Sequence, residues 1–178
     1  ERWKEDKQKL IDKYYEHGYR DAQILEDSVS NYDGKHVDIY LKVDEGKQYF
    51  LRNVTWVGNT VYSTDYLSAL LGMKKGDVYN QKLLHKRLNE DEDAVGNLYY
   101  NNGYVFSNIN PAEVNIDGDS IDLEMRVTEG PQAYLSHIRI NGNTRLYENV
   151  VRRELRTKPG DLFSKDAVMR SVRELASM

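Results

Sequence analysis

An internal repeat with a spacing of 84 or 85 residues constrains the fold of this 178-residue chain more than any other feature. A fixed period of this kind indicates that one structural unit recurs along the chain. Four motifs agree on the spacing: Val57-Gly58-Asn59-Thr60 with Asn141-Gly142-Asn143-Thr144, Lys75-Gly76-Asp77 with Pro159-Gly160-Asp161, 37–46 with 121–130, and Tyr14-Tyr15 and Gly18-Tyr19 with Tyr99-Tyr100 and Gly103-Tyr104. We therefore predict a tandem of one small module.

The period divides the chain into three parts. Residues 1–47 form the C-terminal part of one module, 48–130 form a complete module, and 131–178 form the N-terminal part of a third. The boundaries fall at short polar turns, Glu45-Gly46 and Glu129-Gly130-Pro131, and no Ser/Gly-rich or Pro-rich linker separates the parts. Neighbouring modules are therefore expected to lie close together, with little hinge freedom.

The first half of the complete module reads as one strand and two helices. The run 50–57 predicts a strand, because its alternate residues Val54 and Trp56 share one face. Thr64-Asp65 supplies capping oxygens and negative charge for a short helix that ends at Leu71. Asn80 predicts the start of a second, longer helix. Its apolar stripe, with one polar interruption, is Leu84, Leu88, Asp91, Val95 and Leu98/Tyr99.

Two strands complete the module. The first is predicted from Val105 to about Ile116, and the second from Ser120 to Thr128. Asp33-Gly34 predicts a two-residue hairpin turn at the corresponding place in the first module. The order is βααββ, which predicts an α+β fold: a three-stranded mixed sheet with two helices on one face. The expected core is Trp56, Leu67, Leu70, Leu84, Leu88, Val95, Leu98, Leu123 and Met125.

The composition argues against several classes of function. Net charge is −4 and mixed along the chain, so no basic footprint for nucleic acid is present. No apolar run approaches the roughly 20 residues that span a bilayer as a helix. The chain has no cysteine, and its histidines, His17, His36, His85 and His137, lack metal-ligand spacing. Without a nucleophile elbow or a phosphate loop, we expect no catalytic residue, cofactor or metal, and no enzyme.

Two surface features each have two interpretations. The run Glu90-Asp91-Glu92-Asp93 is either an acidic docking patch or a solvated helix face, and the nearby Lys86 and Arg87 favour the solvated face. The paired tyrosines at 14–15 and 99–100 form either an aromatic binding ledge or part of the packing. Recurrence at one structural position favours packing.

These motifs resemble POTRA domains, the polypeptide-transport-associated modules of BamA-type outer-membrane protein assembly factors. The resemblance covers the whole chain and is carried by the βααββ order, the Gly-Asn after each first strand, the Gly-Tyr after each second helix and the Glu-Gly junctions. The third part, with Asn141-Gly142-Asn143-Thr144, 151–156 and Pro159-Gly160-Asp161, resembles the last POTRA domain before a barrel. A period of 84 is somewhat long for such modules, which implies longer loops here.

The resemblance implies a periplasmic portion of a bacterial outer-membrane protein, corresponding to the third to fifth modules of its tandem. Its partners would be unfolded outer-membrane proteins and the accessory lipoproteins of the assembly complex. The protein would meet the membrane only through a barrel outside these residues. The alternative function is a structural spacer, in a two-partner secretion or cell-division protein, that binds no client.

The candidate binding residues lie in the strand after each Gly-Tyr. The resemblance implies that this strand lies at the edge of its sheet, where unpaired main-chain groups accept an extended segment of another protein. Pro111 lacks an N–H and limits pairing beyond it. The alternative is an ordinary edge strand that binds nothing. The candidates are Val105, Phe106, Ser107, Asn108 and Ile109 in the complete module, and Gln23, Ile24, Leu25, Glu26 and Asp27 within 22–29 of the first.

The two partial modules complement each other. The third part is expected to hold a strand over 134–140 without the two strands that would pair with it, and 1–47 carries those two strands. We therefore predict that head-to-tail self-association completes the module if the protein is this short. The alternative is that these residues are a piece of a longer chain.

Overall fold

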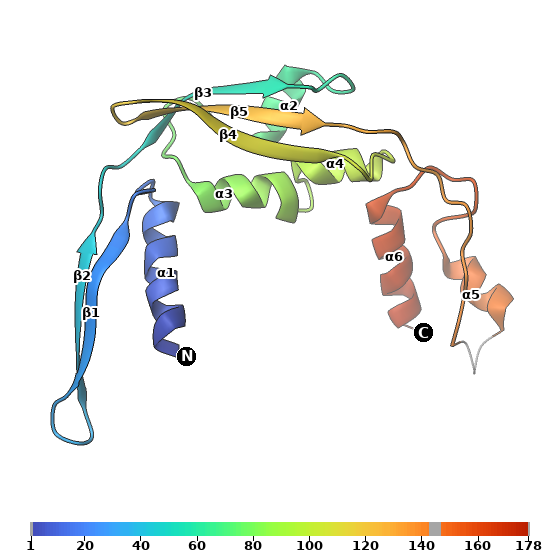
Figure 1. Cartoon of the computed structure of the whole chain (residues 1–178). Helices are drawn as coiled ribbons and strands as arrows, with labels where there is room; N and C mark the ends of the chain where they lie inside the picture. Colours follow the sequence, from blue (N-terminus) through green and yellow to red (C-terminus); the bar gives the residue numbers. More distant parts are fainter. Residues whose placement is uncertain (1, 143–146, 178) are drawn as a thin grey trace.

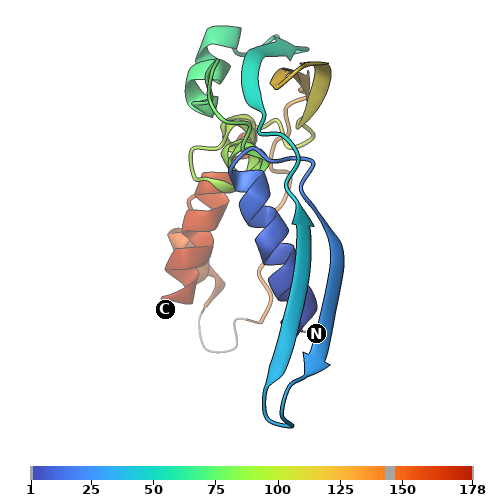
Figure 2. The same cartoon turned by 90° about the vertical axis from the view of Figure 1, so that its left-hand side faces the viewer.

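The computed structural model describes residues 2–142 and 147–177. The complete module lies in the middle, with α1 beside the β1–β2 hairpin at one end and α5 and α6 at the other (Figure 1). Figure 2 shows that α1 and α6 extend from the middle module toward the same side. The elements are α1 (Arg2–Glu16), β1 (Gln23–Asn31), β2 (Val37–Asp44), β3 (Phe50–Val57), α2 (Thr64–Leu71), α3 (Gln81–His85), the π-helical turn η1 (Lys86–Glu90), α4 (Val95–Asn101), β4 (Asn108–Asp117), β5 (Ser120–Thr128), α5 (Glu148–Glu154) and α6 (Lys165–Ala176).

The middle module is a three-stranded mixed sheet in the order β3-β5-β4. Strand β3 runs parallel to β5, and β4 runs antiparallel to β5. The helices cover one face of this sheet, as Figure 1 shows. The predicted α+β class and βααββ order are confirmed, and β4 lies at an edge of the sheet.

The core forms where the inward face of β5 meets the helices. Alternate residues of β5 are buried, because successive side chains of a strand point to opposite faces. Most of the predicted core is buried, but Leu70 and Leu98 are only partly buried. Tyr99 is fully buried instead of Leu98, and its ring packs edge-on against Tyr62 and Tyr104. Packing is therefore the role of Tyr99, whereas Tyr100 is partly buried.

The prediction of one long second helix is wrong, because α3, η1 and α4 replace it. The main-chain N–H of Asp91 bonds to Lys86, five residues back, and the helix ends there. Since Asp91 would otherwise turn inward with the apolar stripe, the break lets its carboxylate meet Arg87 at 3.1 Å. Helix α2, the first helix of the middle module, is capped by the Ser63 hydroxyl, and Thr64-Asp65 lies within its first turn.

Three segments also depart from the predicted strands. The β1–β2 connection is the five-residue loop 32–36 rather than a two-residue turn, because Asp33 Oδ1 accepts hydrogen bonds from Lys35 N and His36 N. Strand β4 begins at Asn108, not Val105. Within the described residues, the expected strand 134–140 is reduced to a bridge between Tyr134 and Leu162, since a ladder needs a partner strand. The motif residues 143–144 lie outside the described residues.

Candidate strand-addition site

The two edges of the middle sheet differ in how their main chains are used. At β3, Leu51 donates to the carbonyl of Asp77 at 2.8 Å and accepts from Gly76 at 2.7 Å, so a loop already pairs with this edge. In the part of the chain that the structure describes, β4 makes no main-chain hydrogen bond beyond its ladder with β5. Its outer edge therefore remains able to pair with another strand.

Pro111 indicates which β4 residues face that open edge. It lies opposite Met125 in a continuous register that runs from Asn108 to Glu113. Proline has no N–H to donate. The ladder with β5 is therefore complete if the N and C=O of Pro111 point away from β5. Ile109 and Glu113 then also point outward, because this direction alternates along a strand. The Glu113 side chain is only 23% exposed although the residue as a whole is exposed, which agrees with an outward main chain.

The five candidates of the middle module do not share one structure. Asn108 and Ile109 lie in β4, whereas Val105, Phe106 and Ser107 precede it in a turn. That turn is closed by the main-chain N–H of Ser107, which donates to Tyr104 O at 3.1 Å. Ser107 and Ile109 are buried, and Phe106 is 67% exposed. The open edge therefore runs from Asn108 to Asp117, later in the chain than predicted.

Gln23, Ile24, Leu25, Glu26 and Asp27 all lie in β1, which pairs with β2 alone. The register shifts at Leu25, so this edge carries a β-bulge. Between β1 and α1 lies a hollow of about 380 Å³, lined by Lys4, Lys7, Gln8, Ile11, Ile24 and Asp27.

Asp27 holds two α1 side chains at this hollow. Its Oδ2 accepts hydrogen bonds from Lys7 Nζ at 2.8 Å and Trp3 Nε1 at 3.0 Å. The bonds from Lys7 and Trp3 lower the pKa of the Asp27 carboxyl. The sequence prediction missed these α1 residues; the four-residue spacing of Trp3 and Lys7, which puts them on one helix face, was the available signal.

The Glu-Gly and Gly-Asn-Thr motifs meet in the middle module. Glu129 Oε1 accepts hydrogen bonds from Thr60 N at 2.9 Å, Val61 N at 3.0 Å and the Tyr99 hydroxyl at 3.0 Å. Burial raises the pKa of Glu129, but the bonds from Thr60, Val61 and Tyr99 outweigh it, and the net pKa lies below its ordinary value. The two motifs therefore fix the turn after β3.

The Gly-Tyr motif joins one module to the next. Gly18 accepts from Tyr49 N at 2.9 Å, and Gly103 accepts from Ala133 N at 2.8 Å. Both glycines have positive φ, and a Cβ on Gly103 would lie 2.5 Å from Leu162 Cδ1. Besides ending a helix, each glycine thus allows close approach of the following module.

The first of these joints also contacts the edge strand. Arg20, from the first module, approaches Glu113 of β4 at 2.6 Å. The Tyr79 hydroxyl donates to the same carboxylate at 2.9 Å, and burial raises the pKa of Tyr79 to about 12. Glu113, within the open edge, is therefore held against the preceding module by its side chain.

Residues 2–142 and 147–177 contain no group of three or more His, Cys, Asp or Glu side chains placed to hold a metal ion. None of the helices in the same ranges has the length and apolar character needed to cross a membrane.

Comparison with known proteins identifies similar sequences along the chain. The family described as "POTRA: Surface antigen variable number repeat" matches residues 1–46, 49–130 and 133–178. A putative outer membrane protein assembly factor of Treponema pallidum is 30% identical over 179 residues, which cover 97% of this chain and 21% of that protein. The outer membrane protein assembly factor BamA of Neisseria meningitidis is 28% identical over 174 residues, or 96% of this chain and 21% of that protein. The chain thus spans about a fifth of the length of these relatives.

Solved structures give the same result. The crystal structure of Haemophilus influenzae BamA POTRA3-5 has a TM-score of 0.78 and 25% sequence identity, over 98% of this chain and 68% of that one. BamA from Haemophilus ducreyi lacking POTRA domains 1–3 has a TM-score of 0.52 and 18% identity, over 70% of this chain and 22% of that one, and supports the fold alone.

Proposed function

This chain belongs to the POTRA family, and on that premise we propose that it is the periplasmic part of an outer-membrane protein assembly factor that receives unfolded client proteins by strand addition. The three modules, 1–47, 48–130 and 131–178, correspond in this proposal to the third to fifth POTRA domains, as in the similar Haemophilus influenzae structure.

The open edge of β4 carries the proposal. Nine of the ten residues of β4 have ladder partners, all on one side, while a loop already pairs with part of the other edge of the sheet. Main-chain hydrogen bonds do not depend on the sequence of the incoming strand, so such an edge accepts many different β-rich clients. Unfolded outer-membrane proteins, whose strands alternate apolar and polar residues, are clients of this kind.

The edge also limits what it binds. Facing outward, Ile109 and Glu113 each offer an N–H and a C=O, whereas Pro111 offers only a C=O. A β-bulge between Glu113 and Asn115 bends the strand beyond them. Prolines and β-bulges in edge strands restrict edge-to-edge pairing and so oppose aggregation. The segment 109–113 therefore binds a short client strand and releases it.

The edge of β1 is the second binding surface in this proposal. Its hollow is lined by the apolar side chains of Ile11 and Ile24 together with Lys4 and Lys7. Such a surface suits a more selective partner, because side-chain pockets add specificity to main-chain pairing. We assign it to an accessory lipoprotein of the assembly complex.

Amide hydrogen exchange tests the proposal at single residues. An extended peptide from an outer-membrane protein should protect the amides of Ile109 and Glu113, while Asn108, Asn110 and Ala112 are already protected by β5. Protection confined to the helices would overturn strand addition at β4. Peptides of accessory lipoproteins, tested in the same way, should protect β1 instead.

A spacer function has its own supporting observation. Both joints repeat the same pair of hydrogen bonds: Gln48 Nε2 donates to His17 O at 2.9 Å, and Gln132 Nε2 donates to Asn102 O at 3.1 Å, beside the main-chain bonds of Gly18 and Gly103. Such joints hold neighbouring modules at a set angle. Intact joints together with no protection of β4 or β1 by any peptide would favour the spacer.

A further inference from the structure

A charged groove lies at the joint between the middle and third modules, away from the open edge of β4. It encloses about 560 Å³. The middle module contributes residues from the end of η1 through α4, and the third module contributes α6. All of these residues are described by the structure.

Direct hydrogen bonds fix the floor of this groove. Lys165 Nζ donates to Asn97 Oδ1 at 2.7 Å, and Asp166 N donates to Asn101 Oδ1 at 2.8 Å. Asn97 is only 8% exposed, and its own Nδ2 is held by Asp91 O at 2.7 Å. Because buried, satisfied polar groups hold their positions, the two walls stand at a fixed separation.

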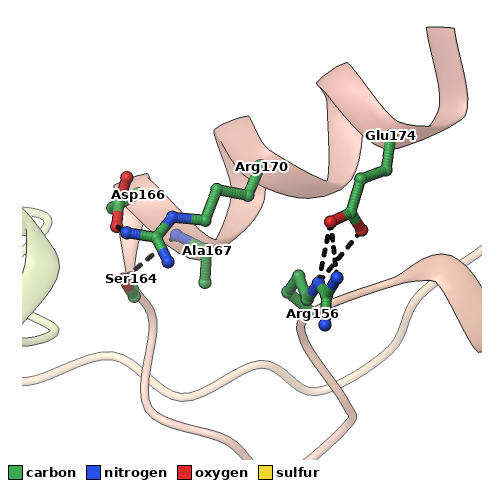
Figure 3. Close-up of a pocket in the computed structure, with 6 residues that line it drawn as sticks. All are labelled: Arg156, Ser164, Asp166, Ala167, Arg170 and Glu174. Atoms are coloured by element: carbon green, nitrogen blue, oxygen red, sulfur yellow. Dashed lines mark hydrogen bonds and ion pairs between the residues drawn. The ribbon is translucent and has the colours of Figure 1, made fainter. Parts of the chain in front are cut away.

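The walls carry opposite charge. Glu90, Glu92 and Asp93 form the wall of the middle module, and Arg170 and Arg173 belong to the wall of α6. No ion pair joins the two walls within the described ranges. Arg170 turns along its own helix to Asp166 at 2.7 Å, and in the adjacent hollow Arg156 pairs with Glu174 (Figure 3).

The first joint provides an internal comparison. At the positions of Asn101 and Asp166 it has Glu16 and Lys82, and these two side chains form an ion pair of 2.6 Å across the joint. That pair lowers the pKa of Glu16 to about 2. Charge is thus neutralised between modules at the first joint. At the second joint the groove carboxylates Asp93 and Glu90 pair within the middle module, with Arg87 and His85, and Glu92 and Arg173 face the groove from opposite walls.

We propose that this groove binds a helix of a partner protein that carries Lys or Arg along one side and Asp or Glu along the other. A simple ion would satisfy only one wall. A helix satisfies its own main-chain groups, and the helical walls have no free ladder to offer an extended strand. Met169, 46% exposed between the walls, accepts an apolar side chain of the helix. In this proposal Glu90, Glu92 and Asp93 form a docking surface, while the pairing of Lys86 and Arg87 with Asp91, and of Arg87 with Asp93, agrees with the partial neutralisation that the sequence favoured.

Charge reversal tests the groove with the whole chain. The probe is a labelled helical peptide of about 20 residues, with lysines along one side and glutamates along the other. Glu92→Lys and Arg173→Glu should each weaken binding of the peptide by about threefold to tenfold. Each replaces one charge of a wall by the opposite charge, which then repels the side of the peptide that faces it. The double variant keeps Glu90, Asp93 and Arg170 and leaves a mixture of charges on both walls, so it should bind the peptide more weakly than either single variant.

Two controls make the result decisive. Arg153→Glu makes the same charge change on α5, where the side chain is 78% exposed outside the groove, and should leave binding unchanged. Protection of β4 by a client peptide should also survive all groove variants, which separates this proposal from strand addition. Single variants that bind the peptide normally, or a double variant that binds no more weakly than the wild-type chain, would refute the groove.

Discussion

Replacing Pro111 by alanine is expected to strengthen binding of client strands. The main chain at Pro111 points away from β5 in the arrangement that keeps the whole ladder, so the open edge lacks one N–H at this position. Alanine restores that donor at the centre of the segment 109–113 without adding a large side chain. Few substitutions on this surface are expected to increase affinity, which makes the direction of the effect informative.

The magnitude follows from one added hydrogen bond. A main-chain hydrogen bond contributes about 0.5–1.5 kcal/mol net, which corresponds to roughly twofold to twelvefold tighter binding. The folded protein should at the same time lose about 0.4–1 kcal/mol of stability, because alanine gives the unfolded chain more freedom than proline. Affinity and stability are therefore expected to change in opposite directions.

Calorimetric titration with an extended peptide from an outer-membrane protein measures the affinity, and hydrogen exchange measures protection of the main-chain amide that the Pro111→Ala substitution introduces. Pro131→Ala is the matched control, since the same chemical change occurs at a module boundary outside β4. Unchanged or weaker binding by Pro111→Ala, with native circular dichroism, would show that Pro111 does not face the incoming strand.

Four further predictions concern stability and assembly. Tyr99→Ala should cost about 3–5 kcal/mol in urea unfolding, and the partly buried Leu98→Ala clearly less. The folded-state pKa of Glu129 lies below its ordinary value of 4.5, so the ionised Glu129 contributes to stability above pH 4.5, and this contribution is lost as pH falls through the folded-state pKa. Glu129→Gln should therefore flatten the acid side of the unfolding free energy measured from pH 3 to 7. Gly103→Ala, which brings a Cβ to 2.5 Å from Leu162 Cδ1 at φ +84°, should loosen the second joint in small-angle scattering while leaving the middle module folded. If 1–47 of one molecule completes the third part of another, residues 1–178 should show a mass that rises with concentration in light scattering; a constant monomer with a protected third module would exclude this completion.

Much of the fold follows from patterns that are local in sequence. The alternation of Ile121, Leu123, Met125 and Val127 specifies a strand buried on one face, and the repeat specifies that the module recurs. Strand β3 and the helix 64–71 match their predicted bounds for the same reason. The structure follows the hydrophobic period and the module spacing, because these two patterns decide which side chains can be buried together.

The break of the second helix at Asp91 was not determined locally. Helical spacing favours one continuous helix, and only the tertiary structure holds the Arg87 side chain on the carbonyls of Leu70 and Leu71, where it also pairs with Asp91. The start of β4 at Asn108 has the same kind of cause, since the turn at Tyr104–Ser107 packs against the end of its own module, where a Cβ on Gly130 would lie 3.2 Å from Phe106 Cβ.

The sequence by itself determined the module, its repeat and the family, because periodicity and turn residues act over a few neighbours. Which edge is open, how Glu129 joins two motifs 69 residues apart, and why the groove beside Arg173 keeps its charge were decided only by the tertiary structure. Hydrogen bonds and ion pairs depend on atoms within about 3–4 Å, and residues distant in sequence reach that separation only when the sheet order and the joints are set.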